Sequence, residues 1–61
     1  MKRTALIKHI QKYGCSLLRE GARHAVYYNP NNGRTTAVPR HNDIVDVLAR
    51  KICRDLGIPE I

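Results

Sequence analysis

Two stretches decide the fold: Gly21-Ala22-Arg23-His24-Ala25-Val26-Tyr27-Tyr28-Asn29-Pro30, and Arg34-Thr35-Thr36-Ala37-Val38-Pro39-Arg40-His41. Both are rich in Val, Thr and Tyr, which favour strands, and they flank the turn-forming run Asn31-Asn32-Gly33. The pattern therefore predicts an antiparallel hairpin. Because a hairpin brings its two far ends together, a cationic cluster is expected at the rim of a sheet. Its members are Arg23, His24, Arg40 and His41.

The loop between the two strands sets their register. If three residues centred on Asn32 form the loop, Gly33 takes the left-handed conformation that such loops require. The resulting cross-strand pairs are Tyr28 with Thr36, Val26 with Val38, and His24 with Arg40. This register places two valines on one face, as expected for a core, whereas a shift by one residue sets Val26 opposite Ala37.

Outside the hairpin, the sequence predicts two amphipathic helices. Apolar residues recur at three- and four-residue intervals in two segments, which is the helical period. The apolar residues of the first segment are Leu6, Ile7, Ile10 and Tyr13, and those of the second are Ile44, Val45, Leu48, Ile52 and Leu56. The expected start and stop signals are Thr4 and Gly14 for the first helix, and Asn42 or Asp43 and Gly57 for the second.

These segments together predict an α+β fold. A weaker strand over 15–20 precedes the hairpin strands 24–29 and 34–38, and Gly21 is expected to adopt a positive φ in the turn between the first two. The order is α-β-β-β-α, and one face of a three-stranded antiparallel sheet is available to bury both helices. This is the layout of double-stranded-RNA-binding-type domains, and we expect one domain spanning residues 1–61.

The charge of the chain favours a polyanionic partner. Eleven Lys and Arg against five Asp and Glu give a formal net charge of +6 and a pI near 9.9. Such an excess favours nucleic acid, because phosphate contacts release counterions. A basic surface that docks an acidic protein is the alternative.

Several other classes of protein are not expected. No apolar run approaches the roughly 20 residues that cross a bilayer, and no secretory signal is apparent, so we expect a cytoplasmic protein. Cys15 and Cys53 are far apart in the sequence and form no CxxC pair, so they are expected to be free, buried thiols. Clustered metal ligands are missing, and we expect neither a metal nor another cofactor.

The predicted cluster has the residue types needed to bind and cleave RNA. If the second helix begins beside it, the N–H groups of that helix point at a bound phosphate, and Arg23 and Arg40 add charge. A histidine ordinarily titrates near pKa 6.5, so His24 can take the proton of a 2′-hydroxyl, while a protonated His41 serves the departing 5′-oxygen. A surface or capping role for either histidine is the alternative.

Other residues are expected to contact RNA around this cluster. Tyr27 and Tyr28 can stack on bases, although one of them is expected in the core. Lys8 and Lys12, on the polar side of the first helix, and Gly21 are further RNA-binding candidates.

The sequence resembles the HicA family of bacterial toxins. The resemblance covers nearly the whole chain: Ala5-Leu6-Ile7-Lys8 running to Tyr13-Gly14, His24 to Pro30, Val38-Pro39-Arg40-His41, and Leu48 to Ile52 running into Asp55-Leu56-Gly57-Ile58-Pro59. Many relatives have Gly-Ser-His where this chain has Gly21-Ala22-Arg23-His24. The serine hydroxyl is therefore missing, and Arg23 is expected to take over phosphate positioning.

The resemblance implies a double-stranded-RNA-binding-like fold and metal-independent endoribonuclease activity on mRNA. His24 matches the family's catalytic histidine, and His41 matches a position where histidine is common. The implied partner is a HicB-type antitoxin that covers the site. Two other functions stay open on the sequence: a non-catalytic RNA-binding module, and a basic face that mainly docks an acidic protein.

Overall fold

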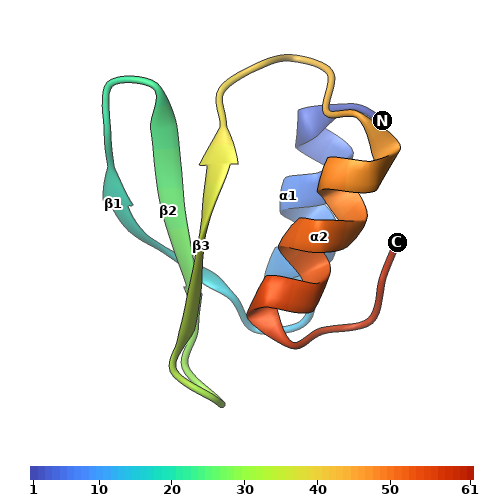
Figure 1. Cartoon of the computed structure of the whole chain (residues 1–61). Coiled ribbons are helices and arrows are strands. Elements are labelled where there is room, and N and C mark those ends of the chain that lie inside the picture. Colours follow the sequence, from blue (N-terminus) through green and yellow to red (C-terminus); the bar gives the residue numbers. More distant parts are fainter.

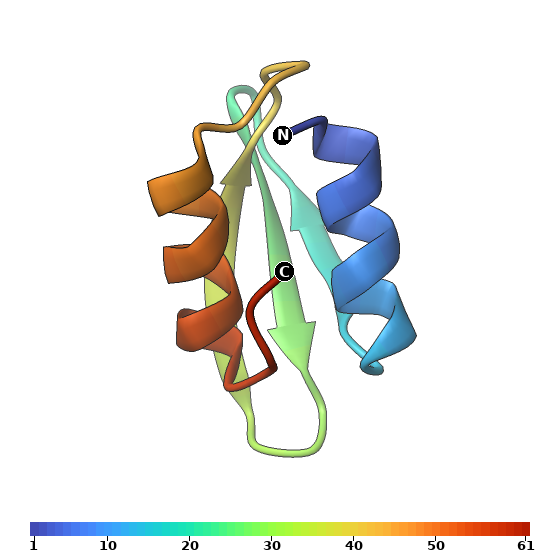
Figure 2. The same ribbon diagram turned by 90° about the vertical axis from the view of Figure 1, so that its right-hand side faces the viewer.

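The computed structural model describes residues 1–61. Its elements, in chain order, are α1 (Arg3–Lys12), β1 (Ser16–Glu20), β2 (His24–Asn29), β3 (Arg34–Pro39) and α2 (Asp46–Leu56). The strands form one antiparallel sheet in the order β1-β2-β3, and both helices lie on the same face of it (Figures 1 and 2). The predicted α-β-β-β-α order and the double-stranded-RNA-binding-like layout are confirmed. No helix is both long enough and apolar enough to cross a membrane.

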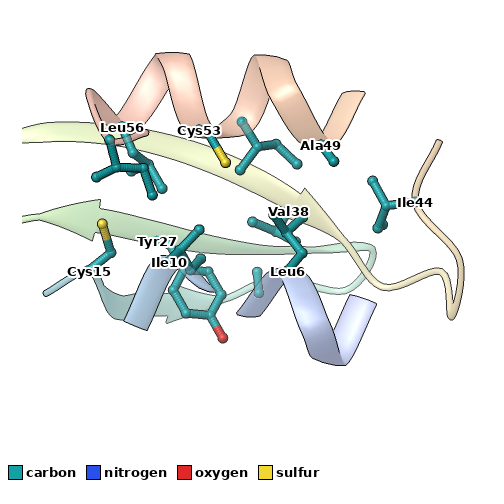
Figure 3. Packing of buried hydrophobic residues seen from close by; sticks show 12 residues of the cluster. Leu6, Ile10, Cys15, Tyr27, Val38, Ile44, Ala49, Cys53 and Leu56 are labelled. Carbon is teal, nitrogen blue, oxygen red and sulfur yellow. The ribbon is translucent and has the colours of Figure 1, made fainter. Parts of the chain in front are cut away.

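The hydrophobic core lies between the helices and the sheet (Figure 3). Strand β2 contributes Ala25, Tyr27 and Asn29, because alternate residues of a strand point to the same face and these three are buried. The twelve apolar members of the core are Leu6, Ile10, Cys15, Ala25, Tyr27, Val38, Ile44, Ala49, Ile52, Cys53, Leu56 and Ile58. Cys15 and Cys53 are free thiols, and burial raises the pKa of both.

The predicted hairpin register is wrong by one residue. Asn29 pairs with Arg34, so the connecting loop has four residues, 30–33, and Val26 lies opposite Ala37. Val38 instead pairs with Ala25 on the buried face. Gly33 does have the expected positive φ, at 73°.

The buried amide of Asn29 joins the end of β2 to the end of α2. Its Nδ2 donates to the Leu56 carbonyl at 2.9 Å, and Asn32 Nδ2 donates to the same oxygen at 3.0 Å. Carbonyls in the last turn of a helix lack intrahelical partners, so these two asparagines satisfy an acceptor that would otherwise be buried without one. Asn29, which we predicted as the last residue of the second strand, is therefore also a buried link between β2 and the end of α2.

Both predicted helix N-caps are also wrong. Neither helix has a side-chain cap, and α2 begins at Asp46 rather than directly after Asn42 or Asp43. Asn42 and Asp43 instead pair through their backbone with the N-terminal segment. Lys2 forms a β-bridge with Asp43, and the Arg3 amide donates to the Asn42 carbonyl at 2.8 Å. Because the helix starts later, Val45 is 69% exposed, and Ala49 and Cys53 take its place in the buried stripe.

The C-terminal stop signals behave as predicted. Gly14 follows the last residues of α1 with φ 89°, and Gly57 caps α2 with φ 70°. A left-handed residue at this place lets following amides bond the last carbonyls of the helix. The Ile58 amide accordingly donates to the Cys53 carbonyl at 3.0 Å.

A polar contact joins α2 to the edge strand β3. Asp55 accepts hydrogen bonds from Lys51 at 2.8 Å and from the Thr36 hydroxyl of β3 at 3.3 Å. The Lys51 hydrogen bond is the main cause of a lowered pKa at Asp55, and the Thr36 bond acts in the same direction. The ionised carboxylate therefore stabilises the packing of α2 on β3.

The substitution Asp55→Asn is expected to lower stability near neutral pH. A carboxyl group whose pKa is lower in the folded state stabilises that state above its unfolded pKa, ordinarily 3.8, and this stabilisation is lost as the pH falls through the folded value. The difference in unfolding free energy between wild type and Asp55→Asn should thus shrink below pH 3.8 in urea titrations. Asp43→Asn, which removes a carboxylate that forms no ion pair, is the control. A difference that does not change with pH would contradict this assignment.

Candidate functional site

The four predicted rim residues lie together. Arg23, His24, Arg40 and His41 are all exposed, and they line an open depression of about 440 Å³. Arg23 belongs to the turn between β1 and β2, His24 is the first residue of β2, and the other two directly follow β3. Antiparallel pairing thus brings these segments to the same end of the sheet, as the sequence predicted.

The turn that carries Arg23 and His24 is short and tightly bonded. Glu20 pairs with Ala25, and the Gly21 amide donates to the His24 carbonyl at 2.8 Å, which leaves two residues in the connection. The prediction of a positive φ at Gly21 is wrong, because only Gly14, Gly33 and Gly57 have one. Glycine is required there for space: a Cβ would lie 2.9 Å from the His24 carbonyl oxygen.

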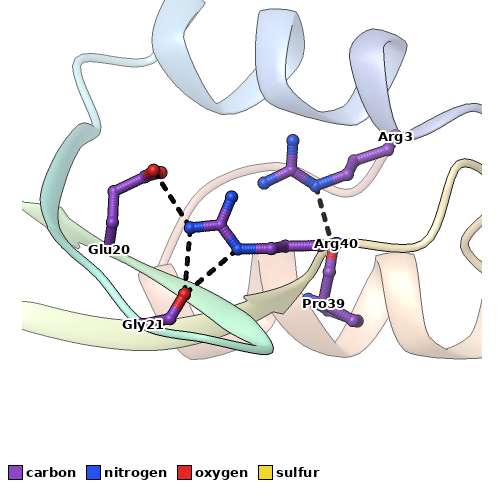
Figure 4. Close-up of polar contacts among 5 residues, drawn as sticks. All are labelled: Arg3, Glu20, Gly21, Pro39 and Arg40. Carbon is purple, nitrogen blue, oxygen red and sulfur yellow. Dashed lines mark hydrogen bonds and ion pairs between the residues drawn. The ribbon is translucent and has the colours of Figure 1, made fainter.

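The side chain of Arg40 holds this turn against the end of β3 (Figure 4). Its Nε and Nη2 donate to the Gly21 carbonyl at 3.2 and 3.0 Å, and Nη2 also lies 3.0 Å from the Glu20 carboxylate. Beside it, Arg3 of α1 donates from Nε to the Pro39 carbonyl at 2.8 Å. Three segments distant in sequence are therefore joined around the depression.

The two rim arginines consequently differ. Arg40 uses two of its nitrogens on the protein, and the Glu20 carboxylate offsets its charge. Arg23 belongs to none of the four ion pairs, so its guanidinium is available to an anion in the depression. The sequence pattern, which treated both arginines alike, did not distinguish these roles.

The helix N-terminus that we expected in this site is not there. Helix α2 starts at Asp46, five residues beyond His41, and no helical residue lines the depression. The intervening segment carries the buried Ile44, whose amide donates to the Met1 carbonyl at 2.8 Å. Any anion in the depression is thus held by side chains rather than by the N–H groups of a helix.

The other predicted RNA-binding residues are dispersed. Lys8 and Lys12 are exposed on α1 and do not line the depression; Lys12 Nζ lies 5.8 Å above the Tyr13 ring. Gly21 takes part through its carbonyl, which accepts from Arg40. We overlooked Arg3, which lies far from both histidines in the sequence, and Glu20, which lies four residues before His24 but was not expected to pair with Arg40.

Neither histidine of the depression is committed to a structural contact. His24 and His41 have no side-chain hydrogen bond, whereas His9 Nε2 lies 2.7 Å from the Pro59 carbonyl. His24 pairs with Pro39, not with Arg40 as predicted. No cluster of three or more His, Cys, Asp or Glu side chains is placed to hold a metal.

Comparison with known families identifies the chain. The profile described as "HicA toxin of bacterial toxin-antitoxin" matches residues 4–58, which is most of its 61 residues. The chain belongs to the HicA toxin family. No curated protein and no solved structure matches it. The match makes the chain a toxin of a bacterial toxin–antitoxin system, and the depression is the candidate site of this HicA-type toxin.

The tether formed by Arg40 can be tested without RNA. Replacing it by Gln removes an ion pair and two charge-assisted hydrogen bonds, and should cost about 1 kcal/mol of unfolding free energy. Amide hydrogen exchange at Gly21 should accelerate by about fivefold, because the turn then opens more often. Arg40→Lys, which keeps the charge but loses the fork geometry, should fall between the two.

Arg23→Gln is the matched control, since it removes the same charge from the same depression. It should leave both the stability and the exchange rate of the Gly21 amide unchanged. Equal effects of the two substitutions would mean that charge, and not the tether, orders the turn.

Proposed function

We propose that this HicA-type toxin is an endoribonuclease that cleaves mRNA, with His24 as its catalytic base. The observation that carries the proposal is an exposed, uncommitted imidazole beside a free guanidinium and a second imidazole in one open depression. A single-stranded phosphodiester can enter such a site from solvent. Membership of a toxin family supports the same conclusion.

The proposed reaction uses the 2′-hydroxyl of the RNA as its nucleophile. His24 removes the hydroxyl proton, the 2′-oxygen bonds to the adjacent phosphorus, and the bond from phosphorus to the 5′-oxygen breaks. The products are a 2′,3′-cyclic phosphate and a 5′-hydroxyl, whose proton comes from His41. DNA lacks the nucleophile and is not a substrate.

Arg23 supplies electrostatic stabilisation in this scheme. Negative charge grows on the phosphoryl oxygens as the new bond forms, and a guanidinium aimed at them lowers the barrier. Arg23 is suited to this because the protein does not neutralise it. The reaction as proposed needs no metal and no other cofactor.

The proposed inhibitor is a HicB-type antitoxin that covers the depression in the cytoplasm. The excess of Lys and Arg over Asp and Glu suits an acidic partner as well as RNA, so antitoxin and substrate would compete for one surface. Under this proposal, residues 1–61 act as one toxin domain.

A non-catalytic RNA-binding module is the second candidate, favoured by the dispersed cations such as Lys8 and Lys12. It predicts salt-sensitive RNA binding without strand scission. Incubation of the purified protein with labelled mRNA separates the two, because only the nuclease yields fragments ending in a cyclic phosphate.

The substitution His24→Ala should reduce cleavage by about 10³-fold, which is typical for removing a general base. RNA affinity and the unfolding midpoint should change little, because His24 is exposed and makes no side-chain hydrogen bond. His9→Gln, which alters an imidazole outside the depression, should cleave normally. Cleavage by folded His24→Ala at the wild-type rate would refute the assignment of the base.

The substitution His41→Ala tests the proposed acid. It should lower the rate on mRNA, because the departing 5′-oxygen then lacks its proton donor. A ribonucleotide ester with a nitrophenolate leaving group needs little protonation, so His41→Ala should cleave it nearly as fast as wild type. An equal loss on both substrates would exclude His41 as the acid.

A further inference from the structure

The sheet has one face that no other element covers. Both helices pack against the opposite face, as the two ribbon views agree (Figures 1 and 2). Strand alternation and the observed pairing assign the uncovered face to every second residue of β2 and to their partners. We call this the open face; its residues are Ser16, Arg19, His24, Val26, Tyr28, Thr35, Ala37 and Pro39.

The two adjacent tyrosines of β2 lie on different faces. Tyr27 is in the core and only 7% exposed, whereas Tyr28 lies on the open face and is half-buried. The cross-strand partners of Tyr28 are Ser16 and Thr35, whose small side chains leave its ring accessible. The sequence left open which tyrosine can stack on a base, and the structure selects Tyr28.

Tyr28 and His24 belong to the same row of β2. They are four residues apart, a separation of about 13 Å at the rise of a strand. Between them lies Val26, which is half-buried and faces Ala37. An RNA strand that leaves the depression along this row therefore passes over the apolar side chains of Val26 and Ala37 and reaches the ring of Tyr28.

The charges on the open face are cationic. Arg19 of β1 pairs with Val26 of β2, is exposed and forms no ion pair. Arg23 lies beside the same row, at the depression. The acidic residues of the chain lie elsewhere. Glu20 is bonded to Arg40, Asp43 lies in the segment before α2, Asp46 and Asp55 are on α2, and Glu60 is bonded to Arg54.

We propose that a single-stranded segment of RNA binds along the open face, with one base stacked on Tyr28 and a phosphate near Arg19. The inference rests on the proposed function, since the scissile phosphate then occupies the depression. Single-stranded RNA fits this surface because an unpaired base offers its flat side to an aromatic ring, whereas a duplex keeps its bases stacked inside. A row of apolar and aromatic groups beside guanidiniums has the chemistry of a single-strand platform.

Binding can be measured on protein that carries His24→Ala, so that cleavage does not interfere. The probes are a fluorescent single-stranded RNA of about eight nucleotides and the same strand in a duplex. Tyr28→Thr, which preserves strand preference, should raise the Kd for the single strand about tenfold, and Tyr28→Phe should leave it unchanged. Tyr13→Thr, on the helical layer, is the control and should have no effect.

Arg19 provides a second test that does not depend on packing of the sheet. Arg19→Gln should reduce the slope of log K against log salt by about 0.7, the value for one phosphate contact on a single strand. Arg50→Gln, an exposed position on α2, should leave the slope unchanged.

The proposal is overturned if Tyr28→Thr and Arg19→Gln both bind the single strand like the parent, or if the duplex binds as tightly as the single strand. It is also overturned if Tyr28→Thr changes only the mass measured by light scattering, since the face would then join two copies of the chain. Failure of the nuclease proposal is distinguishable: RNA would still bind through Tyr28, but the protein with His24 intact would release no fragments.

Discussion

The buried amide of Asn29 holds the end of the central strand against the helical layer. By bonding the last carbonyl of α2, it pins the end of β2 to the helical layer, and alternation then places Ala25 and Tyr27 in the core. His24 consequently belongs to the uncovered side. A register shifted by one residue would exchange the two faces of β3 against β2 and bury a different set of side chains. Asn29 and the proposed catalytic residue therefore lie on opposite faces of the same strand, one bonded to the helical layer and the other exposed.

The ion pairs distinguish cations that are neutralised within the protein from cations that are free to bind a substrate. Four of the five carboxylates lie near a cationic group, among them Asp55 with Lys51 and Glu20 with Arg40. Exposed pairs of this kind contribute little stability, but they determine which cations stay unneutralised. Arg19 and Arg23 remain so, and both border β2. Unneutralised guanidiniums beside the proposed substrate site also speed encounter with a polyanion.

Much of the fold was predictable because its determinants are local. Apolar periodicity located both helices, Val and Tyr content located β2, and glycines marked the helix ends. The register was missed because the connecting loop has four residues rather than the expected three, and its Asn32 side chain bonds the distant Leu56 carbonyl, a contact that local sequence does not reveal. The start of α2 was missed for a related reason. Asn42 and Asp43 are residue types that commonly cap helices, but here their backbone pairs with Lys2 and Arg3 of the N-terminal segment. In the site, the convergence of the two histidines followed from topology alone, whereas the engagement of Arg40 by Glu20 required side-chain geometry.

Arg3 bonds the chain on both sides of Arg40 and His41, through its guanidinium to Pro39 at the end of β3 and through its amide to Asn42. Arg40 and His41 lie between these points, so the strip that bears them is clamped at both ends by one residue of α1. Fraying of the first turn of α1 would break these two bonds, and Arg40 and His41 would then be held less firmly at the depression. The first turn of α1 therefore helps to position the site, although none of its residues lines the depression.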